Sequence, residues 1–116
     1  MGLKVLSGIL VTRGHSSGNV TIDFRDHSIT GTLTDAGQKR AVGRMGGDHG
    51  FNQTPCKIVA LREIKTQERE QLLGRTEVDH FRINDTEINR DRLEIEWRAT
   101  GGSEIEEISY LVVGDA

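Results

Sequence analysis

The side chains of this sequence that most readily do chemistry are its four histidines: His15, His27, His49 and His80. None of them lies two or four residues from another, and Cys56 has no second cysteine beside it. The local pairs of ligands that mark zinc sites are therefore missing. Asp48 and His49 lie in a glycine-rich stretch, which would be catalytic only if folding brought a nucleophile or a further carboxylate to it. We expect no metal, no cofactor and no enzyme activity, with a catalytic His49 as the third alternative.

Paired carboxylates are the second candidate for chemistry. Glu94 and Glu96 alternate with Leu93, Ile95 and Trp97, so both carboxylates share one side of an extended strand. General acid–base catalysis is conceivable for such a pair. The solvated side of a strand explains it equally well, and that is the interpretation we favour.

The same alternation recurs along the chain and predicts the elements that must position these residues. In the second half the predicted strands are Lys57–Ile64, Arg92–Arg98 and Ile105–Val113, anchored by Pro55, Trp97 and Tyr110. In the first half they are the apolar segments around Leu3–Val11, Val20–Phe24 and Ile29–Leu33. Many short strands at close spacing are typical of a sandwich. We predict an all-β protein, a small antiparallel β-sandwich of about six to eight strands.

The connections are predicted from turn-forming residues. Glycines crowd Thr34–Asn52, which favours one long Gly-rich surface loop. Thr66–Leu73 has the composition of a single helical turn or a polar loop. Turns are expected at Asn84–Thr86 and Asn89–Asp91, and Ala99–Ser103 is expected to join the last two strands as a hairpin.

Composition limits the classes of protein. The 116 residues suffice for one domain, 1–116, and only 34% are hydrophobic and 4% aromatic, so we expect contacts between subunits to supplement a lean core. The net charge of -3 offers no basic surface for nucleic acid. No signal peptide and no membrane span are predicted, which suggests a cytoplasmic origin with release or attachment to a particle left open. The single cysteine, Cys56, is expected to be a buried, inert thiol.

The second half also resembles a known family. Phe51–Pro55, followed by the apolar run Lys57–Ile64, resembles the beginning of the conserved part of the H-type lectin domain. Arg92–Trp97 and Ile108–Gly114 resemble its closing strands. The resemblance implies a small antiparallel β-sandwich that forms trimers or pairs of trimers and binds sugars at subunit boundaries. Related domains occur in phage tail fibres.

The resemblance also implies site residues. Trp97 and Arg98 match the tryptophan–histidine pair that contacts sugar in the family, and Arg75 falls near its arginine strand. Arg98 stands where the family has histidine, and Tyr110 stands where it has tryptophan. Leu73-Gly74 replaces the asparagine that precedes the arginine.

Two functions are expected from these observations. The first is a non-enzymatic lectin, a trimer or hexamer that recognises glycans through Trp97, Arg98 and Arg75 at subunit interfaces. The alternative is a structural component of a viral or phage particle, such as a tail or capsid protein, with the same kind of sandwich and no ligand chemistry.

Overall fold

The computed structural model describes residues 2–33, 36–43, 50–64, 81–99 and 104–116. They form eight strands: β1 (Leu3–Val11), β2 (Ser17–Asp23), β3 (Ile29–Gly31), β4 (Ala36–Val42), β5 (Cys56–Ile64), β6 (Phe81–Ile88), β7 (Arg92–Ala99) and β8 (Glu104–Asp115). The described residues contain no helix, and hence none that is long and apolar enough to cross a membrane. The predicted helical turn at Thr66–Leu73 lies outside the described residues.

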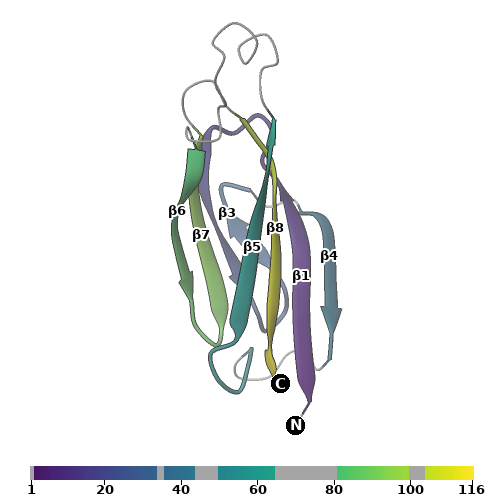
Figure 1. The fold of residues 1–116 in the computed structure, drawn as a ribbon. Coiled ribbons are helices and arrows are strands. Elements are labelled where there is room, and N and C mark those ends of the chain that lie inside the picture. The colour runs from purple at the N-terminus through teal and green to yellow at the C-terminus, as the bar shows by residue number, and fades with distance from the viewer. Residues whose placement is uncertain (1, 34–35, 44–49, 65–80, 100–103) are drawn as a thin grey trace, which may run out of the picture.

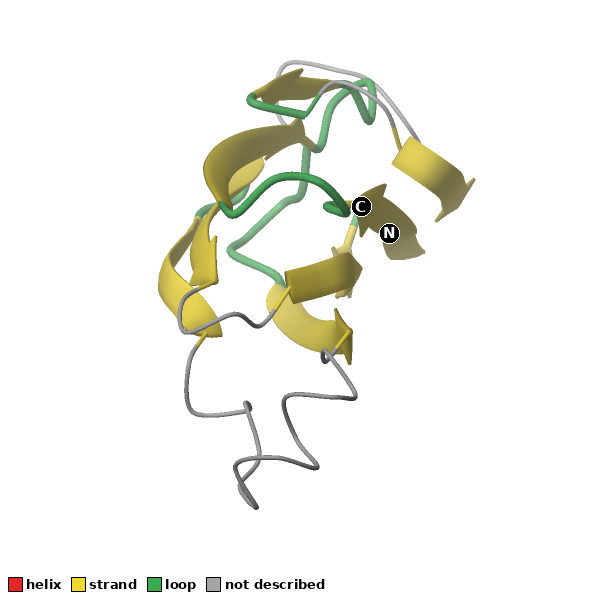
Figure 2. Ribbon diagram, turned by 90° about the horizontal axis from the view of Figure 1, so that it is seen from above, coloured by secondary structure: helices red, strands yellow, loops and turns green. Residues whose placement is uncertain are grey.

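The strands form two antiparallel four-stranded sheets. Sheet A has the order β4-β1-β8-β5, and sheet B has the order β3-β2-β7-β6 (Figure 1). Figure 2 looks down the strands and shows how the two sheets curve around a common interior. The predicted all-β sandwich is therefore confirmed.

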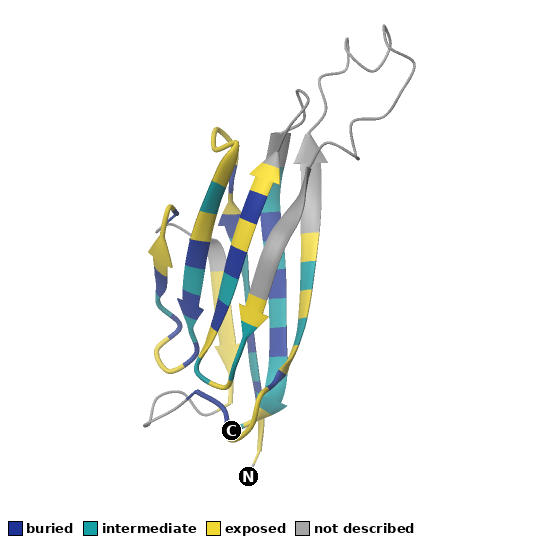
Figure 3. Ribbon diagram, turned by 90° about the vertical axis from the view of Figure 1, so that its left-hand side faces the viewer, coloured by how far each residue is buried: buried dark blue, intermediate teal, exposed yellow. Residues whose placement is uncertain are grey.

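Strict alternation along the strands builds the core, because successive side chains of a strand point to opposite sides. In β7, Leu93 and Ile95 are buried while Glu96 and Arg98 are exposed, as predicted, and Trp97 is buried beside them. Figure 3 shows the resulting bands of buried and exposed residues along the strands. The buried apolar residues are Leu6, Leu10, Val20, Ile22, Phe24, Ile29, Leu33, Phe51, Leu93, Ile95, Trp97, Ile108, Tyr110 and Val112.

Each sheet has one glycine that makes room for a large aromatic ring on the neighbouring strand. Gly8 is paired with Tyr110 in sheet A, and Gly18 is paired with Trp97 in sheet B. A Cβ atom at Gly8 would lie 2.4 Å from the Tyr110 Oη, and one at Gly18 would lie 2.6 Å from the Trp97 Cη2. The two rings therefore lie across the glycine backbones and fill the interior from both sides.

The predicted loop Thr34–Asn52 is wrong in part, because it contains β4. Ala36–Val42 lacks the alternation of large apolar residues that identifies a half-buried strand. It pairs with β1 at the edge of sheet A, where only one neighbour is needed. The main-chain hydrogen bonds to β1 therefore form this strand without a strong hydrophobic pattern of its own.

Three further predictions are corrected. Ala99–Ser103 does not close a hairpin, because β7 belongs to sheet B and β8 to sheet A. The turn expected at Asn84–Thr86 lies inside β6, beside a register shift between Ile83 and Asp85. Cys56 is exposed, since it points away from the core at the start of β5.

The turn predicted at Asn89–Asp91 is present between β6 and β7. The Asn89 side-chain oxygen accepts hydrogen bonds from the main-chain N–H groups of Asp91 and Arg92, at 2.8 and 2.9 Å. A short polar side chain of this kind stabilises a tight turn by bonding to the backbone just beyond it.

Candidate functional site

Trp97, the predicted sugar-stacking residue, is part of the core. Its side chain is 1% exposed and its ring lies against Gly18. The indole Nε1 is buried, with no hydrogen-bond partner among the described residues. This placement corrects the expectation of a stacking platform, because a ring inside the sandwich offers no surface to a ligand.

Arg98 is exposed at the end of β7, and Arg75 lies outside the described residues. A shallow hollow of about 240 Å³ surrounds Arg98 on the outer side of sheet B. Its lining residues are Ser17, Gly18, Asn19, Glu96, Trp97 and Arg98. The register pairs Ser17 with Arg98 and Asn19 with Glu96, so a hydroxyl, an amide, a carboxylate and a guanidinium group converge there.

The outward residues of sheet B whose side chains the structure describes are polar. We call them the polar face: Ser17, Asn19, Thr21, Asp23, Thr30, Glu87, Arg92, Glu94, Glu96 and Arg98. One row of paired residues crosses all four strands as Thr30, Thr21, Glu94 and Glu87. This is the ordinary surface of an antiparallel sheet that faces water.

The outer side of sheet A is different. One row of paired residues crosses its four strands as Val42, Val5, Val113 and Cys56, with no polar side chain in it. The next row runs Arg40, Ser7, Leu111, Ile58. We call the outward apolar residues the apolar face: Leu3, Val5, Ile9, Val11, Val42, Cys56, Ile58, Leu111 and Val113.

Large side chains on the apolar face are well exposed. Leu3 is 63% exposed and Ile58 is 64% exposed, and Val42 and Val11 follow at 50% and 45%. The outward residues of β1 include no charged side chain at all. Scattered apolar residues are normal on a protein surface, but a contiguous group of this size makes the apolar face a candidate binding surface.

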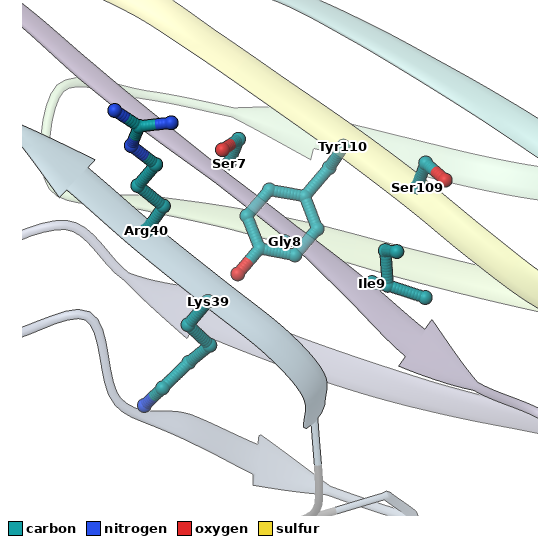
Figure 4. Close-up of a pocket in the computed structure, with 7 residues that line it drawn as sticks. All are labelled: Ser7, Gly8, Ile9, Lys39, Arg40, Ser109 and Tyr110. Atoms are coloured by element: carbon teal, nitrogen blue, oxygen red, sulfur yellow. The ribbon is translucent and has the colours of Figure 1, made fainter.

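A hollow of about 440 Å³ lies near the centre of sheet A. Its lining residues are Ser7, Gly8, Ile9, Lys39, Arg40, Ser109 and Tyr110. Figure 4 shows Ser7, Ile9 and Ser109 around Gly8, with the Tyr110 hydroxyl directed toward β4. Ser7 and Ser109 belong to outward rows, and their small side chains leave space beside the larger Ile9 and Arg40.

Sequence reasoning missed the apolar face and this hollow. β1 and β8 lie at opposite ends of the sequence, so nothing local indicates that Ser7 and Ser109 are neighbours. The available signal was the outward half of each alternation. In Leu3–Val11 the residues between the buried positions are also mostly apolar, unlike the charged residues between those of β7.

Lys4 is the most unusual polar residue of the interior. It is 0% exposed, and its Nζ donates hydrogen bonds to the carbonyl oxygens of Phe24 at 2.8 Å and Gly50 at 2.6 Å. The Nζ also lies 5.0 Å from the centre of the Phe51 ring, a cation–π contact. Burial lowers the pKa of this ammonium group, opposed by the negative charge of Asp23. Lys4 thus holds three segments together, and it is too enclosed to meet a substrate.

His27 and Tyr110 form a second buried polar group. The His27 Nε2 and the Tyr110 Oη are 2.6 Å apart, and the Lys39 Nζ donates a hydrogen bond of 2.9 Å to the His27 carbonyl oxygen. His27 has a left-handed backbone with a φ of 59°. Burial lowers the pKa of its imidazole, with the Lys39 charge acting in the same direction, and burial raises the pKa of the Tyr110 hydroxyl. Both shifts keep these groups uncharged near neutral pH.

The partner of the His27 ring is the Tyr110 phenol rather than a nucleophile or a carboxylate. The part of the chain that the structure describes contains no group of three His, Cys, Asp or Glu side chains that could hold a metal ion. His49 and His80 lie outside it.

The described residues therefore offer two candidate binding surfaces, the apolar face and the polar hollow at Arg98. A scan against models of protein families, a search of curated proteins and a search of solved structures each find no match to this chain.

Proposed function

We propose that this protein is a non-enzymatic structural component of a multi-subunit assembly, of the kind that builds phage tails or capsids. The observation that carries the proposal is the apolar face of sheet A. A β-sandwich that acts alone is expected to present mainly polar residues on both outer sides, whereas the outward residues of sheet A are largely apolar.

The positions of the aromatic residues support assembly over sugar binding. Phe24, Phe51, Trp97 and Tyr110 are each at most 2% exposed. Sugar recognition commonly uses an exposed aromatic ring against the apolar side of the sugar. Among the side chains that the structure describes, no such ring is presented, while exposed aliphatic residues are plentiful.

Sedimentation velocity of the purified protein over a wide range of concentrations tests this function. We expect species well above the 12.9 kDa of a single chain, growing with concentration. A protein that sediments as a single chain at every concentration would contradict the proposal. Measurement in 0.1 M and 1 M salt adds a check, because association through apolar residues persists at high salt while association through surface charges weakens.

Glycan binding is a second candidate, favoured by the hollow at Arg98. Ser17, Asn19, Glu96 and Arg98 bring donors and acceptors together there, and sugar hydroxyls need both. At about 240 Å³ the hollow is smaller than most pockets for whole ligands, so it suits one sugar unit at the end of a glycan. Multivalent presentation by an oligomer would strengthen such a weak site.

A glycan array separates the two candidates. If the hollow binds a glycan, Arg98→Ala should abolish the signal, because it removes the guanidinium donors from the hollow. Arg92→Ala is the matched control, since Arg92 is an exposed arginine on the same side of the same strand but does not line the hollow. If the unmodified protein gives no signal on the array, or if both variants lose the signal equally, this site is excluded.

A further inference from the structure

We propose that the apolar face of sheet A binds the apolar face of a second copy of this chain, as a twofold-symmetric pair of sheets. This inference rests on the proposed function, and it identifies a second copy of the chain as the partner that the apolar face binds. In this pair the twofold axis runs parallel to the strands. It lies between the two stacked sheets, over the line that separates β1 from β8. Each sheet A then lies over the other with its strands aligned, as in common packings of one sheet on another.

The strand register makes this arrangement self-complementary. Rotation about an axis between β1 and β8 places β1 of one copy over β8 of its partner, and β4 over β5. The row Val42, Val5, Val113, Cys56 then lies over the same row in reverse order. Val5 meets Val113 and Val42 meets Cys56, so this row buries apolar groups only.

The hollow at the centre of sheet A gives the pair its fit. Ser7 is paired with Leu111 in the register, and Ile9 is paired with Ser109. Under the twofold rotation Leu111 of each copy lies over Ser7 of the other, and Ile9 lies over Ser109. Two large side chains thus meet two small ones that line the hollow. These residues lie near the centre of the interface. A crossing angle between the two sheets therefore shifts them less than it shifts residues at the edges.

The size and charge of the face agree with a partner of this kind. Nine residues of β1 and four strands give a face of roughly 30 by 19 Å, since strands rise about 3.3 Å per residue and lie about 4.8 Å apart. Two such faces bury about 1,100 Å², just above the roughly 1,000 Å² that a specific interface needs. Among the described outward side chains, the charged ones lie on the edge strand, as Arg40, or at the ends of β8, as Glu107 and Asp115.

The test measures mass and dimer dissociation by analytical ultracentrifugation. We expect the unmodified chain to form a dimer, or a multiple of dimers. Leu111→Lys should weaken dimerisation at least ~100-fold, because an ammonium group would be buried without a partner. Thr21→Lys is the matched control on the polar face and should leave the mass unchanged. Circular dichroism checks that each variant keeps its strands, since both substituted side chains point outward.

A reciprocal exchange tests the twofold fit itself. Leu111→Ser places serine over serine, and Ser7→Leu places leucine over leucine, so each single variant should weaken the dimer about 10-fold or more. The double variant S7L/L111S exchanges large and small residues and should recover most of that loss. Additive losses in the double variant would overturn the arrangement.

The remaining outcomes separate this inference from the function on which it rests. An oligomer that is indifferent to Leu111→Lys would overturn the apolar face as the contact, while the proposed assembly function would stand. An odd-numbered oligomer that Leu111→Lys dissociates would overturn the twofold pairing. A single chain at every concentration would overturn both proposals and leave the face to a different protein.

Discussion

The two sheets of this sandwich have equivalent inner sides and opposite outer sides. Inside, each contributes alternating aliphatic residues and one aromatic ring that lies over a glycine. Outside, sheet B carries threonine, asparagine and charged residues, whereas sheet A carries valine, leucine and isoleucine. The core requires only the inner pattern. The outer difference is therefore not required for folding, and it is the feature on which the proposed assembly rests.

The inner sides, where the sheets are alike, are where substitution costs most. Trp97→Ala should lower the free energy of unfolding by about 3–5 kcal/mol, because it empties the space over Gly18. Urea denaturation followed by circular dichroism measures this loss. The adjacent outward variant Glu96→Ala should change the free energy by less than about 0.5 kcal/mol. Equal losses from both variants would show that β7 does not face the core as described.

Lys4 sharpens the comparison, because it places a charged residue on the inner side of the sheet whose outer side is apolar. Lys4→Met keeps the shape of the side chain but leaves the Phe24 and Gly50 carbonyl oxygens without this donor. We expect a loss of about 1–3 kcal/mol in the free energy of unfolding. Arg92→Met, at an exposed position on the polar face, is the control. A Lys4→Met protein as stable as the parent would mean that both carbonyls are satisfied in another way.

His27 should make stability depend on pH at the edge where β3 and β4 lie. Its pKa is lowered by burial, then by Lys39 and Lys4, and only Asp26 opposes them. The unfolded chain therefore binds more protons, and stability should be full above the ordinary histidine pKa, about 6.5, and fall as the pH drops below it.

The control variants for this pH dependence are matched. His27→Asn removes the titration and tolerates the left-handed backbone, so it should flatten the profile between pH 7 and 5. His15→Asn, at an exposed histidine, should leave the profile unchanged. Asp23, whose pKa is lowered by its hydrogen bond to Arg25, titrates at lower pH and does not interfere. A flat profile for the parent would contradict the prediction.

The smallest effects come from exchanging valine and threonine between the two outer sides, because these side chains have nearly the same shape. Val5→Thr should weaken self-association several-fold by placing two hydroxyl groups, one from each copy, in the apolar row. Thr21→Val should leave both the mass and, within about 0.5 kcal/mol, the free energy of unfolding unchanged. Sedimentation at several concentrations measures both variants. Similar behaviour of the two would remove the distinction between the faces.

The elements with strong alternation were predictable from sequence. Leu93, Ile95 and Trp97 gave β7 its position and orientation, and the class of fold followed from several strands of this kind. β4 was not predictable, because Ala36–Val42 forms through main-chain bonds to β1 rather than through its own pattern. The partner of β8 was also beyond local reasoning. A short polar link after β7 suggests a hairpin, whereas the chain crosses to the other sheet.

The candidate site was less predictable than the fold. Trp97 was predicted to contact a ligand, but Gly18 has no side chain and so leaves room for the indole ring in the core. That choice depends on a pairing between residues far apart in sequence. The apolar face has the same origin, since its rows join residues of β4, β1, β8 and β5 that only the register brings together.

The pairing of β1 with β8 also has a consequence for how the chain is made. It joins Leu3 to Asp115 and Val11 to Glu107, at the centre of sheet A. Contacts so distant in sequence form slowly, and a ribosome completes the other seven described strands before it completes β8. Sheet B has all its strands by then, while β1 still lacks its central neighbour. The nascent chain therefore passes through a period in which sheet A is incomplete. In this period its apolar residues are exposed, and we expect chaperones to bind the chain most readily then.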